Sequence, residues 1–192
     1  MARPQLWVLA GGNGAGKSTF YAEFLAPRGI PIVNADQIAA QLDPQDTVSA
    51  SYRAARLADR IREQLLLEGQ TFCFETVFSH PSKVDFVARA RARDYEIILV
   101  FIHLDNVALN KARVHQRIST GGHPVPDEKI ESRLPRTLRH VGTAIALCDR
   151  VELLDNARHD DPFRRIASVI DGIATSRVEP LPGWATELLD KI

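Results

Sequence analysis

A glycine-rich segment near the start of the chain places the strongest constraint on its fold. Residues 11–18 read GGNGAGKS and match G-x-x-x-x-G-K-[ST] at every specified position. The apolar run Gln5–Ala10 before it is predicted to be a buried strand, and a helix is predicted over residues 17–25. Glycines let main-chain amides approach an anion, and a helix N-terminus adds free N–H groups and a positive dipole end. The sequence therefore predicts a phosphate-binding loop between a buried strand and a helix.

The rest of the chain alternates predicted strands and helices with short connections. We therefore expect an α/β fold of the P-loop NTPase type, a parallel sheet with helices on both faces and a small helical lid. No linker is long enough to divide the chain, so residues 1–192 are predicted to form one domain, with the lid at about residues 117–140. Further strands are predicted at residues 32–33, 71–74, 96–104 and 151–154, helices at 49–68, 81–93, 107–118 and 184–192, a helix start at Pro126, and a hairpin turn at Asp171-Gly172.

Composition and charge argue against several classes of protein. The 192 residues include 24 basic and 24 acidic side chains, and this balance disfavours a dedicated nucleic-acid binder. The two cysteines, Cys73 and Cys148, offer neither a disulfide framework nor metal-ligand spacing, and the histidines show no zinc-binding pattern. No apolar run suits a signal-peptide core or a membrane span, so we expect a cytoplasmic protein with no membrane partner.

Other motifs narrow the kind of P-loop protein. Guanine-specific GTPases carry Asn-Lys-x-Asp, but the nearest segment here, Asn110-Lys111-Ala112-Arg113, ends in the wrong residue and lies on a predicted helix. A transporter-type Leu-Ser-Gly-Gly-Gln signature is absent, and the chain is shorter than most motor or helicase cores. The leading hypothesis is a small-molecule kinase, which needs a base for the acceptor hydroxyl, an acceptor pocket and positive charge on the transferred phosphate.

The glycine-rich loop supplies the predicted binding groups for ATP and Mg²⁺. The Lys17 ammonium is expected to reach the β- and γ-phosphates, and the Ser18 hydroxyl is expected to be a Mg²⁺ ligand. The alternative is a chance match in a glycine-rich turn, but the flanking strand and helix are the context that the motif requires. The residues predicted to contact ATP are Gly11, Gly12, Asn13, Gly14, Ala15, Gly16, Lys17, Ser18 and Thr19.

Three acidic residues follow predicted strands, where ligands bind in open α/β sheets. Asp36 is the candidate catalytic base or Mg²⁺ partner, and the alternative is an N-cap for a helix starting at Gln37. Glu75 is a candidate for binding or orienting the acceptor hydroxyl, and otherwise a surface acid at a strand end. Asp105 resembles a Walker B position, but we favour an N-cap role for it.

Basic side chains gather along one face of the helix predicted after Pro126. Next to a phosphate-binding loop, this pattern favours a lid whose arginines stabilise transition-state charge. A basic helix face on its own is more often a solvated surface. Pro135 lies inside the helix and should kink or divide it. The stripe consists of Lys129, Arg133, Arg136 and His140, and Arg117 approaches from the preceding predicted helix. The candidate lid arginines are Arg117, Arg133 and Arg136.

Several segments between residue 5 and about residue 155 form a recognisable set: residues 11–19, Val33-Asn34-Ala35-Asp36, Phe74-Glu75-Thr76 with Ser79 and Lys83, and Gly121-Gly122-His123-Pro124-Val125-Pro126 with Arg133 and Arg136. Together they resemble the zeta-toxin family of P-loop kinases. The resemblance implies a kinase that uses ATP and Mg²⁺ to phosphorylate the sugar of UDP-N-acetylglucosamine, and that a small helical antitoxin often holds inactive. It also implies that Asp36 is the catalytic base, that Glu75 and Thr76 contact the acceptor, and that the lid arginines are candidates for contact with the γ-phosphate.

The chain also departs from the familiar zeta toxins. We expect neither a long C-terminal extension nor a fused antitoxin segment in this short chain, and Pro135 lies in the predicted lid helix. Another nucleotide or metabolite therefore stays open as the acceptor. Two further hypotheses are an ATP-binding regulatory module that transfers no phosphate, and a kinase of nucleic-acid ends.

Overall fold

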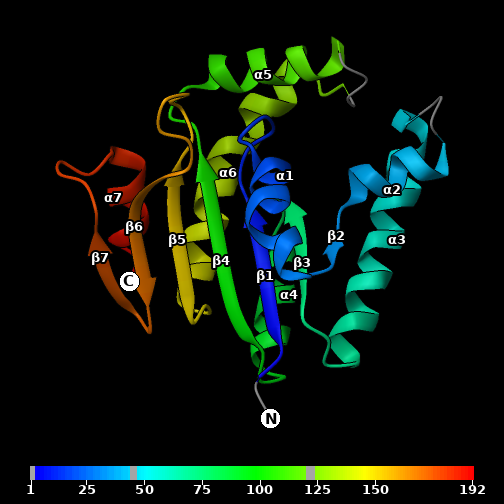
Figure 1. Ribbon diagram of the computed structural model, residues 1–192, viewed down its shortest axis with the longest axis horizontal. Coiled ribbons are helices and arrows are strands. Elements are labelled where there is room, and N and C mark those ends of the chain that lie inside the picture. The colour runs from blue at the N-terminus through cyan, green and yellow to red at the C-terminus, as the bar shows by residue number, and fades with distance from the viewer. Residues whose placement is uncertain (1–2, 44–46, 120–123) are drawn as a thin grey trace.

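The computed structural model describes residues 3–43, 47–119 and 124–192, and the strands within them form one sheet. The strands are β1 (Gln5–Ala10), β2 (Ile32–Val33), β3 (Phe72–Thr76), β4 (Glu96–His103), β5 (Arg150–Asp155), β6 (Arg164–Ile170) and β7 (Ile173–Ser176). Their order across the sheet is β2-β3-β1-β4-β5-β6-β7 (Figure 1). Strands β1 to β5 pair in parallel, whereas β6 and β7 join as an antiparallel edge. This topology confirms the predicted α/β fold with a P-loop-type parallel sheet.

Helices cover both faces of the sheet, as predicted. They are α1 (Lys17–Phe20), η1 (Tyr21–Leu25), η2 (Ala26–Arg28), α2 (Ala35–Leu42), α3 (Thr47–Leu67), α4 (Ser82–Arg91), α5 (Val107–Ser119), α6 (Asp127–Ile145) and α7 (Gly183–Leu189). Helices α3, α4, α6 and α7 pack on one face, and α1, η1 and α5 lie against the other (Figure 1). Among the described residues, no helix combines the length and apolar character needed to cross a membrane.

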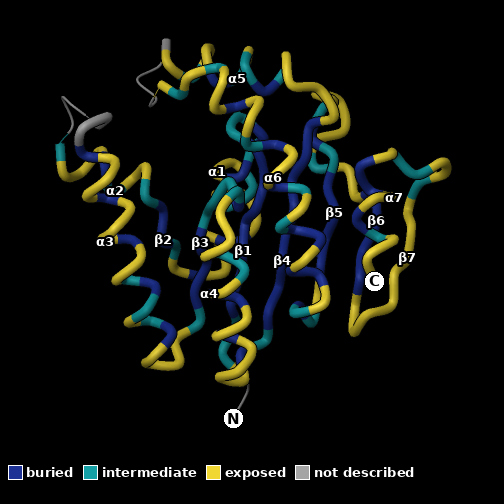
Figure 2. Tube along the Cα trace, turned by 180° about the vertical axis from the view of Figure 1, so that it is seen from behind, coloured by how far each residue is buried: buried dark blue, intermediate teal, exposed yellow. Residues whose placement is uncertain are grey.

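The alternation of side chains along the strands creates the two layers of the core. In β1, Leu6 and Val8 join the core under α3, α4 and α6, while Trp7 and Leu9 join the core under η1 and α5. Because both faces are covered, the central strands are buried along most of their length, whereas the edge strand β7 is exposed at every residue (Figure 2). Gly172 and Asp171 both have positive φ in the turn before β7, which fits the predicted hairpin.

Two helices differ from the sequence-based expectations. The helix predicted over residues 17–25 is α-helical only to Phe20 and continues as the π-helical segment η1. Helix α6 runs unbroken through Pro135, so the proline does not divide it. Pro135 lies on the exposed face, while Ile130, Leu134 and Val141 are buried on the opposite side. Packing of that apolar face compensates for the hydrogen bond that a proline cannot donate.

The sheet brings the predicted site residues together at the carboxyl end of its parallel strands. Strand β1 lies between β3 and β4, and Leu9 and Ala10 are level with Glu75 and Thr76 of β3. Parallel strands all have their carboxyl ends at the same end of the sheet. The loop after β1, the turn after β2 and the end of β3 therefore meet there. Gly121, Gly122 and His123 of the predicted lid turn lie outside the described residues.

Candidate functional site

The glycine-rich loop between β1 and α1 has a backbone that side chains would disrupt. Gly16 has φ of 102°, and a Cβ there would lie 2.4 Å from Asn156 Nδ2. A Cβ on Gly11 would lie 2.2 Å from the main-chain oxygen of Ile102. The first turn of α1 has N–H groups with no intrahelical acceptor, so this loop can present several amides to a polyanion. The conformation therefore fits the predicted phosphate-binding loop.

Two asparagines far away in the sequence hold this loop. Asn156 Nδ2 donates a hydrogen bond of 2.8 Å to the Ala15 carbonyl, and Asn110 Nδ2 donates one of 2.7 Å to the Asn13 carbonyl. Both asparagines are buried. Sequence reasoning missed them, although Asn156 directly follows β5 at the same carboxyl end of the sheet as the other site residues. An asparagine immediately after a predicted parallel strand is the signal that could have indicated its role.

Replacing Asn156 with alanine is expected to destabilise both the protein and its loop. The variant loses the bond to Ala15, and it also loses the acceptor for the Phe163 amide, which lies 3.2 Å from Asn156 Oδ1. Leaving such groups unpaired in a buried site should cost about 1–3 kcal/mol, or about 2–4 °C of Tm for each kcal/mol. Thermal unfolding measures this loss. An exposed control, Gln70→Ala, should lower Tm less, and equal shifts for the two variants would contradict the assignment.

Lys17 lies inside the loop, and its ammonium is at the carboxyl end of the sheet. Its Nζ is 3.0 Å from the Gly11 carbonyl and 2.9 Å from the Gly12 carbonyl, and the side chain is only 6% exposed. Burial lowers the pKa of Lys17, while the carboxylates of Glu75 and Asp36 oppose this shift. Nearby Arg117 and Arg133 lower the same pKa further. The site therefore concentrates positive charge around Lys17, with two carboxylates in compensation.

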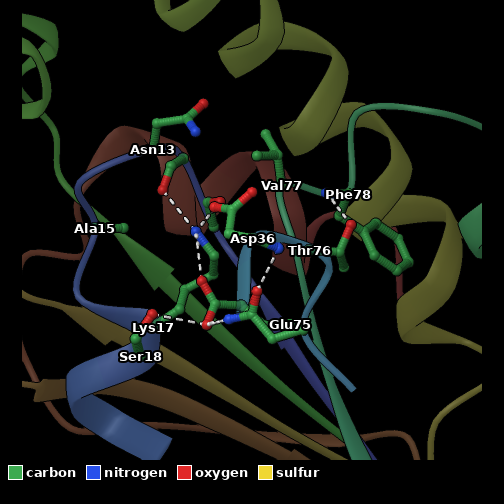
Figure 3. A network of polar contacts seen from close by, with 12 residues as sticks. Asn13, Ala15, Lys17, Ser18, Asp36, Glu75, Thr76, Val77 and Phe78 are labelled. Carbon is green, nitrogen blue, oxygen red and sulfur yellow. Dashed lines mark hydrogen bonds and ion pairs between the residues drawn. The ribbon is translucent and has the colours of Figure 1, made fainter. Parts of the chain in front are cut away.

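Glu75 connects the loop to the turn after β2. Its Oε2 accepts hydrogen bonds of 2.8 Å from the Ser18 hydroxyl and from Asn34 Nδ2, and its Oε1 lies 3.8 Å from Lys17 Nζ (Figure 3). Thr76 also lines the site, and its Oγ1 accepts a bond from the Phe78 amide at 3.0 Å. The structure thus places Glu75 beside Ser18, so its carboxylate adjoins the predicted metal ligand as well as the acceptor side.

Asn34, and not Asp36, caps helix α2. The Asn34 Oδ1 accepts hydrogen bonds from the Asp36 and Gln37 amides at 2.8 and 3.3 Å, and the helix begins at Ala35. The alternative role of Asp36 as N-cap of a helix starting at Gln37 is therefore wrong. Asp36 instead occupies the first turn and lines the cleft beside Lys17 (Figure 3).

A similar correction applies to the start of α5. The Asn106 carbonyl accepts from the Asn110 amide, and Asn106 Oδ1 accepts from the Leu109 amide at 3.2 Å. Helix α5 begins at Val107, so Asn106 occupies the N-cap position that we favoured for Asp105. Asp105 lines a separate hollow beside α6 rather than the cleft at Lys17.

The oxygen atoms around Ser18 suit a hard divalent cation. Its hydroxyl lies 2.8 Å from the Glu75 carboxylate, and Mg²⁺ typically takes one or two protein oxygens and completes its shell with water and phosphate. Within the described residues, no three His, Cys, Asp or Glu side chains form a preformed metal cluster. The residues present therefore fit a Mg²⁺ ion carried in with phosphates better than a permanent metal centre.

One cleft of about 850 Å³ extends from the glycine-rich loop to helix α6 and to Glu75 and Thr76, the residues predicted to contact the acceptor. Lys17, Asp36, Glu75 and Thr76 line it together with Asn13 and Gly14. From the predicted lid, Arg117 and Arg133 line the same cleft, and Arg133 Nη1 lies 3.4 Å from Asn13 Oδ1.

Of the three candidate lid arginines, Arg136 is the one that the structure does not bring to the cleft. Its side chain is exposed, and its Nε donates a 3.1 Å hydrogen bond to the Ser132 carbonyl of the same helix. It is not among the described residues that line the cleft. Arg136 lies three positions after Arg133, but the inward face of α6 is determined by the buried side chains of Leu134 and Thr137.

The fold and the site together define a protein with a P-loop kinase-like fold. A family model described as an AAA domain matches residues 6–137, and the chain belongs to this AAA domain family. An uncharacterized protein of Haemophilus influenzae is 28% identical over 140 residues, which cover 69% of this chain and 99% of the relative.

Two solved structures share the fold. A chain of the AvrRxo1-ORF1:-ORF2 complex with ATP has a TM-score of 0.72 and 18% identity, covering 92% of this chain and 61% of that one. This protein thus spans less than two thirds of the length of that relative. A chain from the PezAT toxin-antitoxin system of Streptococcus pneumoniae has a TM-score of 0.63 and 15% identity, covering 99% and 84% of the two chains.

Proposed function

We propose that this protein is an ATP- and Mg²⁺-dependent kinase that transfers the γ-phosphate to a hydroxyl group of a small molecule. The observation that carries the proposal is the single cleft in which Lys17, Asp36 and Arg133 converge. A polyphosphate on the loop amides would lie against Lys17, while the Asp36 carboxylate remains open to an acceptor. The similar fold of a complex solved with ATP supports the choice of nucleotide.

The proposed reaction is a direct displacement at the γ-phosphorus. The oxygen of the acceptor hydroxyl bonds to phosphorus while Asp36 accepts the hydroxyl proton. At the same time the bond from phosphorus to the β–γ bridging oxygen breaks, and ADP is released. Lys17, Arg117 and Arg133 bind the phosphate oxygens on which negative charge is spread. When bound beside Ser18, Mg²⁺ would neutralise part of that charge. Glu75 positions Ser18, and Glu75 and Thr76 also face the acceptor.

A UDP-sugar such as UDP-N-acetylglucosamine is the acceptor that we propose first. The resemblance to zeta toxins supports it, and the volume of the cleft is in the range of small-molecule sites. We further propose one domain over residues 1–192, whose lid at about residues 117–140 closes over the phosphates. A small helical antitoxin is the proposed protein partner, since a structure from a toxin-antitoxin system shares the fold. Such a kinase would act in the cytoplasm.

Mass spectrometry of a metabolite extract tests the proposal. The protein is incubated with ATP, Mg²⁺ and either the extract or UDP-N-acetylglucosamine, and the expected result is a metabolite that gains one phosphate while ATP is consumed. The same incubation with the Asp36→Asn variant is the control. Binding of ATP without transfer to any metabolite would support the regulatory module instead, and labelling of an oligonucleotide end would support a nucleic-acid kinase.

The two arginines of α6 provide a matched pair of variants. Replacing Arg133 with alanine should lower kcat by about 10²- to 10³-fold, because a charged donor beside the loop is lost. Replacing Arg136 with alanine removes an equal charge from the exposed side of the helix and should leave kcat within about twofold. Steady-state kinetics compares the two. Similar losses in both variants would show that α6 binds phosphate through a different face.

A further inference from the structure

The cleft has a second basic cluster, away from the glycine-rich loop. Arg62 of α3 and Lys83 of α4 both line it, and both contact the same carboxylate, Asp59. Lys83 Nζ lies 3.2 Å from Asp59 Oδ1, and an Arg62 guanidinium nitrogen bonds to the same oxygen atom. Two positive charges therefore share one negative charge, and this cluster has an excess of positive charge.

Arg62 is unusually buried for a group that is not fully paired. Its side chain is 6% exposed, and its Cζ lies 5.1 Å from the ring centre of Phe74 and 5.7 Å from that of Phe86. Among the described residues, Arg62 Nε has no hydrogen-bond partner. A buried guanidinium normally uses most of its donors, so this arrangement is costly unless an anion completes it.

The pKa of Lys83 also reflects the excess of positive charge in this cluster. Burial and the neighbouring charge of Arg62 lower the pKa of Lys83 to about 8, despite the nearby carboxylate of Asp59. An added anion would relieve this repulsion. The two aromatic rings hold the Arg62 plane in place, and a planar guanidinium next to an ammonium is a good arrangement for the oxygens of a phosphate.

We infer that Arg62 and Lys83 form a second anion site, which binds a phosphate or diphosphate carried by the acceptor. This inference rests on the proposed kinase function, because the glycine-rich loop takes the phosphates of ATP and leaves this cluster for the other substrate. Arg62 stacks on Phe74, the residue directly before Glu75, so the cluster adjoins the acceptor side of the cleft. The acceptor is therefore anionic, with its reacting hydroxyl at Asp36 and its charged group at Arg62 and Lys83.

Chemical modification of Lys83 tests this site without any catalysis. The full chain is saturated with Mg–ADP to fill the glycine-rich loop and is then treated with an amine-acylating reagent at pH 8, with or without inorganic pyrophosphate. Pyrophosphate is expected to slow acylation of Lys83 by about fivefold or more, because it shields the amine and raises its pKa. Sodium chloride at equal ionic strength should not do so, and the exposed Lys191 should react at the same rate throughout. Peptide mass spectrometry measures both lysines.

Three variants make the test specific. Arg62→Gln should abolish protection of Lys83 by pyrophosphate. Asp59→Asn should strengthen it several-fold, since the competing carboxylate is gone, and this variant decides the question if Arg62→Gln does not fold. Arg89→Gln removes the neighbouring ion pair between α3 and α4, Arg89–Glu63, which lies outside the cleft, and should leave protection unchanged.

The outcomes separate this site from the proposed kinase function. Acylation of Lys83 at an unchanged rate, or weaker protection in Asp59→Asn, would overturn the anion site. Acetate that protects as well as pyrophosphate would overturn the phosphate assignment and indicate a carboxylate on the acceptor. A parallel sample without Mg–ADP shows whether the nucleotide protects Lys17 from acylation and so reports on the nucleotide loop. A failure of either site is therefore recognised independently.

Discussion

Replacing Lys17 with methionine should reduce kcat/KM for phosphoryl transfer by about 10³-fold while the protein stays folded. The ammonium is buried next to the loop carbonyls, where it can turn toward a bound γ-phosphate with few competing waters. In such a site a charge stabilises the transition state far more than it would in water. Methionine keeps most of the apolar stem of the side chain and removes only the charge.

The stability of this variant separates a functional effect from a structural one. Lys17 is desolvated in the folded protein, and Glu75 keeps its bonds from Ser18 and Asn34 when the ammonium is removed. The ammonium also donates to the Gly11 and Gly12 carbonyls and lies beside Glu75, so we expect a modest fall in Tm with the fold retained, while steady-state kinetics shows the large loss of activity. Lys191→Met, at an exposed residue near the C-terminus, is the control and should leave both quantities unchanged. Activity within about tenfold of the original protein would contradict the proposed role of Lys17.

Replacing Asp36 with asparagine should lower kcat by about 10²- to 10⁴-fold with little change in the KM for ATP. Asparagine has nearly the same shape but cannot accept the proton of the acceptor hydroxyl. The cap of α2 is provided by Asn34, so the helix should remain intact. The loss of one negative charge from its first turn should cost about 0.3–1 kcal/mol of stability.

The measurement for Asp36 is a comparison of turnover and nucleotide binding. Single-turnover kinetics gives the rate of transfer, and equilibrium titration gives the affinity for ATP. Asp85→Asn in the first turn of α4 is the matched control, since it removes an exposed acid from another helix start outside the cleft. Near-normal turnover in Asp36→Asn would falsify the base assignment, and the Glu75 carboxylate would then be the next candidate.

Local patterns in the sequence were enough to predict the sheet and most of its helices. The motif at residues 11–18 specifies a turn that glycine alone tolerates, and apolar runs of strand length predict buried parallel strands. Small errors occurred where propensity is weak, as in the π-helical segment Tyr21–Leu25 after α1. At Pro135 the local rule failed because the buried face of α6 outweighs one missing hydrogen bond.

The candidate site was only partly predictable, for a reason of distance along the chain. Lys17 could be named because it belongs to the glycine-rich motif, and Asp36 because it follows a predicted strand. Asn110 and Asn156 could not, since each contacts the loop across about a hundred residues or more. The contact of Arg62 with Phe74, and the sharing of Asp59 by Arg62 and Lys83, likewise depend on how α3 and α4 pack against β3.

The amino-acid sequence by itself determined the phosphate-binding loop and the alternating order of strands and helices, because both depend on backbone preferences and on the spacing of nearby side chains. Only the tertiary structure decided that Arg133 reaches the loop while Arg136 does not, that Glu75 lies against Ser18, and that Arg62 and Lys83 share one carboxylate. Those contacts depend on the rotation of each helix against the sheet, and this rotation is set by the packing of the whole core.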